Sequence, residues 1–408
     1  MIYLAIFLLL LWFVYLYDYR KERRGYALSF YTLLLIFIIV AGIRYRVGGD
    51  TTIYMRFFDN LHPINELKAS DLEKSRFAPG FIIFMSFLKS IVNDYLFFQI
   101  IHSIIVNTVV FYFLKKNCTH VFFAIFLFFN FLYLYLLFEQ VREALAVVIF
   151  LLAWPFFRKG VWWKWYIASF CAMFFHVSAV VMLFLPLVTL PIVRNLFIFG
   201  NKTVVYCLVA YVVAFLIQTT LFRYIEAIAL TESMLDRAQT YGNMNLRETF
   251  NLNRIFGNVI QFVAYPLLAL YFLFQQKKKG EYLVDQSLLN RESMMVMMSV
   301  YISIFSTFIG IFVRYNNYFL FFSIMVLGDW IFTKIRMARN TVRLGYLTWI
   351  FLFLPLIGVN FYTTYMQSVN RSGTKKAYMM YYPYSSYIDP VKDQNREETI
   401  IYVRRHLH

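Results

Sequence analysis

Residues 121–157, VFFAIFLFFNFLYLYLLFEQVREALAVVIFLLAWPFF, are the stretch from which the fold can be inferred most directly. Two apolar runs cover about 121–138 and 140–157, and the only charged residues, Glu139, Arg142 and Glu143, lie where the runs meet. About 20 apolar residues are enough for a helix to cross a bilayer. We therefore expect two membrane helices joined by a short polar connection.

The rest of the chain has the same character. Its 408 residues are 61% hydrophobic and only 15% charged, whereas soluble domains average about 45–50% and about 25%. Composition therefore argues against a soluble enzyme, a disordered chain or a fibrous repeat, and it predicts an all-α polytopic membrane protein with about 11–13 transmembrane or re-entrant helices. The further apolar stretches lie at about 2–17, 28–43, 80–92, 95–114, 163–192, 203–221, 255–274, 293–312, 315–332 and 344–362.

The charge distribution indicates an orientation in the membrane. With 39 Lys+Arg against 22 Asp+Glu, the net charge is +17. In a soluble chain this value would suggest nucleic acid, but membrane proteins collect Lys and Arg in their cytoplasmic loops. We expect the lipid bilayer, and no nucleic acid, as a partner. The basic clusters are Arg20 to Arg24, Arg158 to Lys164, Lys277 to Arg291, and Lys334 to Arg343.

These clusters divide the chain between the two sides. Basic residues follow the apolar run 2–17, whereas they precede the apolar core of a cleavable signal, so we expect a retained helix with its N-terminus outside. The loops at about 44–79 and 222–254 are then external. The predicted division is a membrane domain, 1–362, and an external Tyr-rich tail, 363–408.

The stretch 80–92 needs a separate interpretation. It is too short for an ordinary span, and counting it as one would put Lys115 and Lys116 outside. We therefore expect a re-entrant or peripheral helix.

Metal and cofactor chemistry have no support in the sequence. Cys118, Cys171 and Cys207 share no close spacing, so neither a disulfide framework nor a zinc site can be built from them. The P-loop, zinc-protease and nucleophile-elbow motifs are absent. We expect no metal site and no cofactor.

The first cluster with chemical potential is RYRVGGDTTIY, residues 44–54, where the second apolar stretch ends. The guanidinium groups of Arg44 and Arg46 can form bidentate hydrogen bonds to phosphate oxygens. The carboxylate of Asp50 can orient a neighbouring group or act as a base. The alternative is an interfacial anchor in which Arg and Asp pair and Tyr54 lies at the headgroups.

The second candidate is Arg142, at the polar junction described above. An arginine inside apolar sequence is costly unless it faces a polar cavity or an anion. The alternative is a structural ion pair with Glu139 or Glu143.

The third candidate is His176 in FHVSA, residues 175–179, where the long stretch 163–192 can break into two short helices. A histidine there can serve as a base or orient an acceptor, or it can be a satisfied helix contact.

Arg314 is the fourth candidate, in RYNNYF, residues 314–319, and Tyr318 lies one helical turn further on. An interfacial arginine is the alternative. The predicted topology puts all four clusters on the external face, where we expect a cavity formed by the periplasmic loops. Arginines around such a cavity suit an amphiphile that carries pyrophosphate.

Together these motifs resemble the EpsG family of Wzy-like polysaccharide polymerases. The resemblance rests on GIRYRVGGDTTIY at 42–54, PGF at 79–81, REALA at 142–146, HVSA at 176–179 and RYNNYF at 314–319, and it covers about residues 1–330. The family's usual Arg-Gln is Arg142-Glu143 here.

The resemblance implies a bacterial inner-membrane glycosyltransferase with its active site at the periplasmic face and a fold related to the lipid-carrier (GT-C-like) class. It would polymerise oligosaccharide units carried on undecaprenyl pyrophosphate into capsule, exopolysaccharide or O-antigen without a metal. A chain-length regulator would fit as a partner. A flippase of the same lipid-linked sugars and an O-antigen ligase are the alternatives.

For such a reaction we expect Arg142 and Arg314 to bind the leaving pyrophosphate, supported by Arg44 or Arg46. His176 and Asp50 are the candidates for the general base, with a slight preference for His176 as base or acceptor-orienting group.

Overall fold

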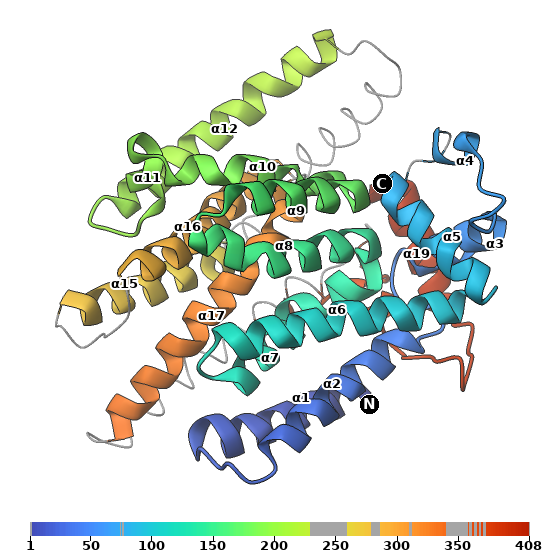
Figure 1. The fold of residues 1–408 in the computed structure, drawn as a ribbon, viewed down its shortest axis with the longest axis horizontal. Coiled ribbons are helices and arrows are strands. Elements are labelled where there is room, and N and C mark those ends of the chain that lie inside the picture. Colours follow the sequence, from blue (N-terminus) through green and yellow to red (C-terminus); the bar gives the residue numbers. More distant parts are fainter. Residues whose placement is uncertain are drawn as a thin grey trace. The chain divides into compact units, whose positions relative to one another are not determined.

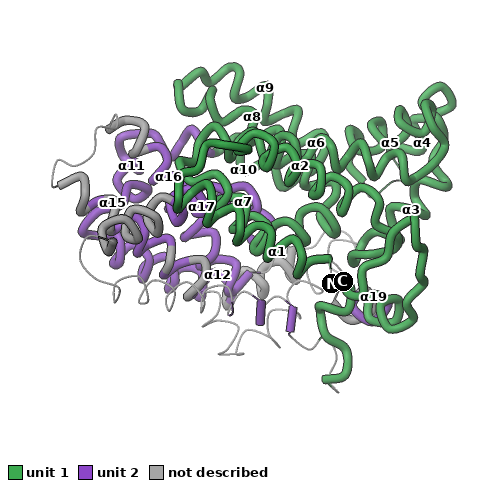
Figure 2. The backbone as a smooth tube through the Cα atoms, turned by 90° about the horizontal axis from the view of Figure 1, so that it is seen from below, with its two compact units in different colours: residues 1–184, 368–400 green, residues 185–367, 401–408 purple. Residues whose placement is uncertain are grey.

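The computed structural model describes residues 2–73, 75, 77–228, 259–278, 286–309, 312–339, 358, 361–362, 365–366, 369 and 373–407. Across these ranges the regular secondary structure is helical, which confirms the predicted all-α class. The chain divides into two compact units, residues 1–184 with 368–400 and residues 185–367 with 401–408 (Figure 2). The predicted stretch 344–362 and loop 222–254 lie mostly outside the described residues.

The first unit is built around long helices that pack side by side (Figure 1). Large apolar side chains such as Leu28 and Phe170 remain exposed on their outer faces, as expected for lipid contact. Among the elements of this unit are the helices and π-turns α1 (Ile2–Phe13), η1 (Val14–Tyr19), α2 (Tyr26–Gly42), α6 (Tyr95–Asn117), α7 (Val121–Phe128), η2 (Phe129–Tyr133), η3 (Tyr135–Glu139), α8 (Val141–Lys159) and α9 (Trp162–Phe175). Its shorter elements are α3 (Thr51–Asn60), α4 (Ala69–Glu73), α5 (Pro79–Ile91), η4 (Val177–Val180), α10 (Val181–Phe184) and η7 (Ala377–Met380).

The two ends of this unit differ in charge. Gln99 at the start of α6 donates to the carbonyl of Gly42 at the end of α2 (2.8 Å). At the opposite end, the Nζ atom of Lys115 lies 4.7 Å from the ring centroid of Phe30. Arg158 reaches the last residue of α6 from the end of α8. Basic clusters therefore gather at one end of the unit and loop 43–50 lies at the other, in agreement with the predicted alternation of the helices.

Helix α5 stays at the end that carries loop 43–50. Near its C-terminus, Lys89 donates to the carbonyls of Phe58 (2.7 Å) and Asp59 (3.0 Å) in the last turn of α3, where helix carbonyls lack partners. Near its N-terminus, Phe81 lies 5.6 Å from Tyr54 of α3, ring centroid to ring centroid. Both ends of α5 therefore contact α3, and the expectation that this helix is re-entrant or peripheral stays a prediction.

The C-terminal segment folds onto loop 43–50. Arg44 and Ser386 form an isolated antiparallel bridge, and the N–H of Gly48 donates to the carbonyl of Met380 (3.0 Å). The Tyr-rich segment therefore packs against this loop, and residues 368–400 belong to the same unit as the N-terminal helices. Its position outside the membrane stays a prediction.

The second unit is also helical. Its polar side chains link α16 to α17: Ser299 donates to the Asn316 side chain (2.8 Å), which in turn donates to Ser303 (2.8 Å). Buried hydrogen bonds of this kind join helices in membranes. The described elements are η5 (Leu185–Thr189), α11 (Pro191–Phe197), α12 (Thr203–Ile228), η6 (Val259–Ala264), α15 (Tyr265–Lys278), α16 (Gln286–Phe308) and α17 (Phe312–Arg339), and helix α19 (Gln394–Leu407) runs from the first unit into the second.

Length and composition identify the helices that could cross a membrane. Among the described residues, Ile2–Tyr19 and Tyr95–Asn117 qualify, and Val177–Thr189 with Pro191–Phe197 would add a third if this pair, bent by 110°, is one span. Tyr26–Gly42, Val121–Tyr133 and Thr203–Gln218 are shorter apolar helices. These helices support a membrane protein, and the predicted number of 11–13 stays a prediction.

Candidate functional site

The candidate site begins where loop 43–50 lies against the junction of the apolar runs 121–138 and 140–157. Gly48 has a φ of +100°, and a Cβ atom on it would overlap the carbonyl oxygen of Phe138. A Cβ atom on Gly49 would lie 3.6 Å from a carboxylate oxygen of Glu139. Gly48 thus lets the loop backbone approach the junction closely, whereas a Cβ atom on Gly49 would make an ordinary van der Waals contact.

Glu139 is the last residue of the π-turn η3 and lies just outside the two apolar runs. Its half-buried carboxylate accepts a hydrogen bond from the hydroxyl of Tyr381, in the C-terminal segment. Burial raises the pKa of Glu139 to about 7, and the nearby charge of Asp50 acts in the same direction. The sequence patterns do not single out Glu139 as a catalytic candidate, although the residue lies in the polar junction between the two apolar runs.

Arg142 lies in the first turn of α8 and is half-buried. Its Nε atom donates to the hydroxyl of Tyr54 (3.2 Å), and its Cζ atom lies 4.5 Å from the ring centroid of Phe77. In the described part of the chain, Arg142 forms no ion pair with Glu139 or Glu143, so the structural pair considered above is not observed. The guanidinium lies at the positive end of the helix dipole, a position that favours an anion.

Asp50 directly precedes α3, whose first turn bonds to its backbone carbonyl. Its half-buried carboxylate has no hydrogen-bond or ion-pair partner among the described residues. The predicted alternative of an Arg–Asp anchor in loop 44–54 is therefore not observed either. Asp50 can accept a proton or a hydrogen bond without breaking an existing contact.

Arg44 and Arg46 instead bind the protein itself. Arg44 is buried, donates to the carbonyl of Ala41 and lies 4.6 Å from the ring centroid of Phe138. Burial lowers the pKa of its guanidinium. Arg46 donates through Nε to Glu397 of α19 (2.7 Å). Both arginines hold the loop in place, so the expected contact with substrate stays a prediction for them.

His176 follows the last residue of α9, which confirms the predicted break in the stretch 163–192. The imidazole is buried, its Nδ1 accepts the backbone N–H of Ser178 (3.2 Å), and the same atom lies 2.6 Å from the Ser178 hydroxyl. Because Nδ1 is an acceptor, the neutral ring carries its proton on Nε2. In its neutral form, His176 therefore acts as a hydrogen-bond donor through Nε2.

The packing of the helices brings His176 and Arg142 to the same end of the first unit. Helices α8 and α9 are consecutive, antiparallel and in contact. Arg142 starts the first helix and His176 ends the second. The ring of Phe84 on α5, 6.3 Å from that of Phe175, connects this end to the α3 region.

Arg314 and Tyr318 lie on α17, in the second unit. Arg314 is half-buried and has no ion-pair partner in the described part of the chain, whereas Tyr318 is fully buried. The first unit therefore brings together Asp50, Tyr54 and Arg142, with Glu139 added. The predicted contribution of Arg314 and Tyr318 stays a prediction.

Comparison with known proteins identifies the family. The model of the EpsG family matches residues 27–386, nearly the whole chain and all five motifs that carried the resemblance. Searches of curated proteins and of solved structures find no match. The likeness to the lipid-carrier glycosyltransferase fold therefore stays a prediction, and the chain belongs to the EpsG family.

Proposed function

We propose that this protein joins oligosaccharide units carried on undecaprenyl pyrophosphate into a surface polysaccharide, at the outer face of a bacterial inner membrane. Membership of the EpsG family indicates a polymerase role in exopolysaccharide biosynthesis. The single observation that carries the proposal is Arg142, a half-buried guanidinium that donates to the hydroxyl of Tyr54 and lies over the ring of Phe77. Such a cation can bind the pyrophosphate of a lipid carrier through charge-assisted hydrogen bonds.

Arg142 would stabilise the leaving group. During transfer, the bond between the anomeric carbon of the donor sugar and the phosphate oxygen breaks, and both electrons leave with undecaprenyl pyrophosphate. A guanidinium aimed at this developing charge lowers the barrier.

Asp50 would act as the general base. The acceptor hydroxyl forms the new bond to the anomeric carbon, and its proton passes to the carboxylate. Asp50 is preferred because its carboxylate has no other partner in the described chain, whereas Nδ1 of His176 already accepts a backbone N–H. This reverses the slight preference for His176 drawn from the sequence, and His176 becomes the donor that orients the acceptor through Nε2.

The arginines of loop 43–50 would position these groups. Arg46 ties the loop to Glu397, and Arg44 packs on Phe138, one residue before Glu139. Glu139, with its raised pKa and its bond to Tyr381, would hold the C-terminal segment against the loop. Arginine, without a metal or a cofactor, would stabilise the charge of the leaving group in this reaction.

The purified full-length protein in lipid nanodiscs, supplied with undecaprenyl-pyrophosphate-linked repeat units, tests the function. We expect a ladder of longer lipid-linked chains and release of undecaprenyl pyrophosphate. The protein in sealed vesicles would separate the alternatives: movement of the lipid across the bilayer without elongation would identify a flippase. Transfer only to an added lipid A core acceptor would identify a ligase, and either result would contradict the proposal.

A further inference from the structure

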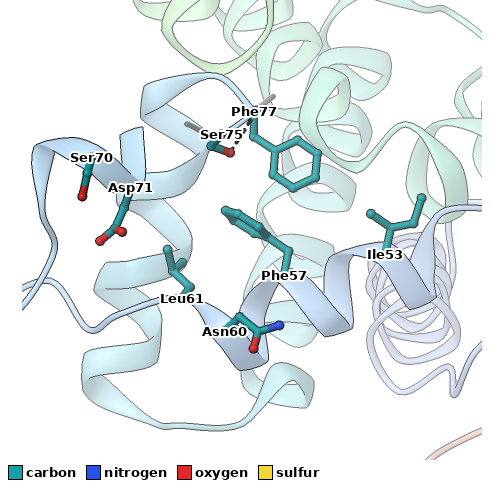
Figure 3. Close-up of a pocket in the computed structure, with 8 residues that line it drawn as sticks. All are labelled: Ile53, Phe57, Asn60, Leu61, Ser70, Asp71, Ser75 and Phe77. Carbon is teal, nitrogen blue, oxygen red and sulfur yellow. Dashed lines mark hydrogen bonds between the residues drawn. The ribbon is translucent and has the colours of Figure 1, made fainter. Parts of the chain in front are cut away.

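A second feature, next to Arg142, is an open cavity of about 420 Å³ between α3, α4 and the residues Ser75 and Phe77. Figure 3 shows the rings of Phe57 and Phe77 at its centre, with Ile53 on one side and the α4 residues Ser70 and Asp71 on the other. The two ring centroids lie 4.5 Å apart and the planes are nearly perpendicular. Cavities of this size commonly hold small ligands.

The polar groups of the cavity retain hydrogen-bonding capacity. Asn60 donates its amide N–H to the carbonyl of Arg56 (2.8 Å), and this leaves its side-chain oxygen available. The Ser70 hydroxyl has no partner among the described residues. One oxygen of Asp71 accepts from the backbone N–H of Lys68 (3.0 Å), and the other remains available as an acceptor.

The charge of the cavity argues against a phosphate ligand. The backbone N–H of Lys68, followed by the imidazole of His62, lowers the pKa of Asp71, so its carboxylate is ionised at neutral pH. A carboxylate repels an anion but accepts hydrogen bonds from hydroxyl groups. Aromatic faces beside such acceptors suit a neutral ligand that has apolar C–H faces and many hydroxyls, which is the chemistry of a sugar ring.

The cavity is connected to the candidate site through one side chain. Phe77 lines the cavity and its ring also lies 4.5 Å from the Cζ atom of Arg142. If one sugar ring binds on the cavity side of Phe77, the next sugar therefore lies close to the guanidinium of Arg142. That next sugar is either the donor sugar that carries the pyrophosphate or the acceptor sugar whose hydroxyl attacks the donor.

We propose that this cavity is a sugar-binding subsite that holds one ring of the oligosaccharide and sets the distance of the reacting sugar from Arg142. The identity of the ligand rests on the proposed function. The sugar in the cavity can belong to the donor chain or to the acceptor unit. Substrates that can act only as donor or only as acceptor distinguish these two sources.

Steady-state kinetics of the full-length protein in nanodiscs tests the subsite. The free repeat-unit oligosaccharide has no pyrophosphate and can only accept, whereas a lipid-linked unit with methylated terminal hydroxyls can only donate. Phe57→Leu keeps an apolar side chain but removes the ring, and Ser70→Ala removes one hydroxyl. Asn65→Ala is the matched control, because Asn65 is an exposed polar residue of the same loop outside the cavity.

For Phe57→Leu we expect KM to rise about tenfold for the substrate whose sugar occupies the cavity, with kcat nearly unchanged, and we expect no change in the control. A change in KM for the acceptor or for the donor identifies the source. Unchanged KM for both, in protein that still elongates, would overturn the subsite and leave the proposed function intact.

Binding of the free oligosaccharide, followed by saturation-transfer NMR, keeps the two proposals distinguishable. Binding by wild-type protein that is lost in Phe57→Leu, without any elongation, would support the subsite and contradict the polymerase. Equal binding by Phe57→Leu and wild type, together with an unchanged KM for the donor, would overturn the subsite.

Discussion

At the scale of single residues, Arg142 is the side chain whose chemistry can be tested most directly. Arg142→Lys keeps the charge but loses the planar fork that donates to Tyr54 and packs on Phe77. We expect polymer synthesis to fall by about 10²-fold or more, the size of effect seen when one transition-state donor is removed. The rate of elongation by purified protein at equal protein level measures this loss.

Arg158→Lys is the matched control, since Arg158 is an arginine at the other end of the same helix. It should elongate at the wild-type rate. If Arg142→Lys produces the wild-type ladder of chain lengths, Arg142 does not stabilise the leaving pyrophosphate.

His176 allows a separation of structure from chemistry. An asparagine can accept the Ser178 N–H as Nδ1 does and so preserve the local turn, but it offers no donor at the position of Nε2. We therefore expect His176→Asn to fold with an unchanged melting temperature and to accumulate unpolymerised lipid-linked units. If His176→Asn retains normal activity while His176→Ala melts earlier, the histidine has only a structural role.

At the scale of elements, the contact between α5 and α9 carries a prediction about Gly80. A Cβ atom on this glycine would lie 2.6 Å from the carbonyl oxygen of Phe174, two residues before His176. Gly80→Ala must push α5 away from α9, so we expect a loss of about 1–3 kcal/mol in stability and a reduced rate of elongation. Thermal unfolding of the purified variant would measure the first effect.

Gly200→Ala serves as the control, because a Cβ atom there meets nothing within 4 Å. It should leave melting temperature and activity unchanged. An unaltered melting temperature in Gly80→Ala would show that α5 does not pack against α9 at this distance.

The sequence predicted the helices better than their detailed contacts. Apolar runs mark the helices, and the short length of 80–92 predicts a re-entrant or peripheral helix. The π-turn before Glu139 and the pairing of Arg46 with Glu397 could not be inferred, since both depend on contacts with distant segments. The same applies to Arg44, which looked like a substrate ligand but is buried against Phe138. Periodicity carries no information on such long-range packing.

At the scale of the whole molecule, the alternation of basic clusters and candidate residues was visible in the sequence. In the first unit the structure shows the same separation: Lys115 and Arg158 at one end, Asp50 and Arg142 at the other. Basic loops orient a membrane protein with that end toward the cytoplasm. We therefore expect the end with Asp50 to face outward, as the proposed function requires.

Cysteine labelling of intact cells can decide this orientation. In a background without Cys118, Cys171 and Cys207, single cysteines replace the exposed residues Asn65, Asn93 and Lys159. A membrane-impermeant maleimide should label Asn65→Cys and Asn93→Cys on intact cells, and Lys159→Cys only after permeabilisation. Asn65 and Asn93 flank α5, so labelling on opposite sides would mean that α5 crosses the membrane, and labelling of Lys159→Cys alone would invert the orientation and put Arg142 on the cytoplasmic side.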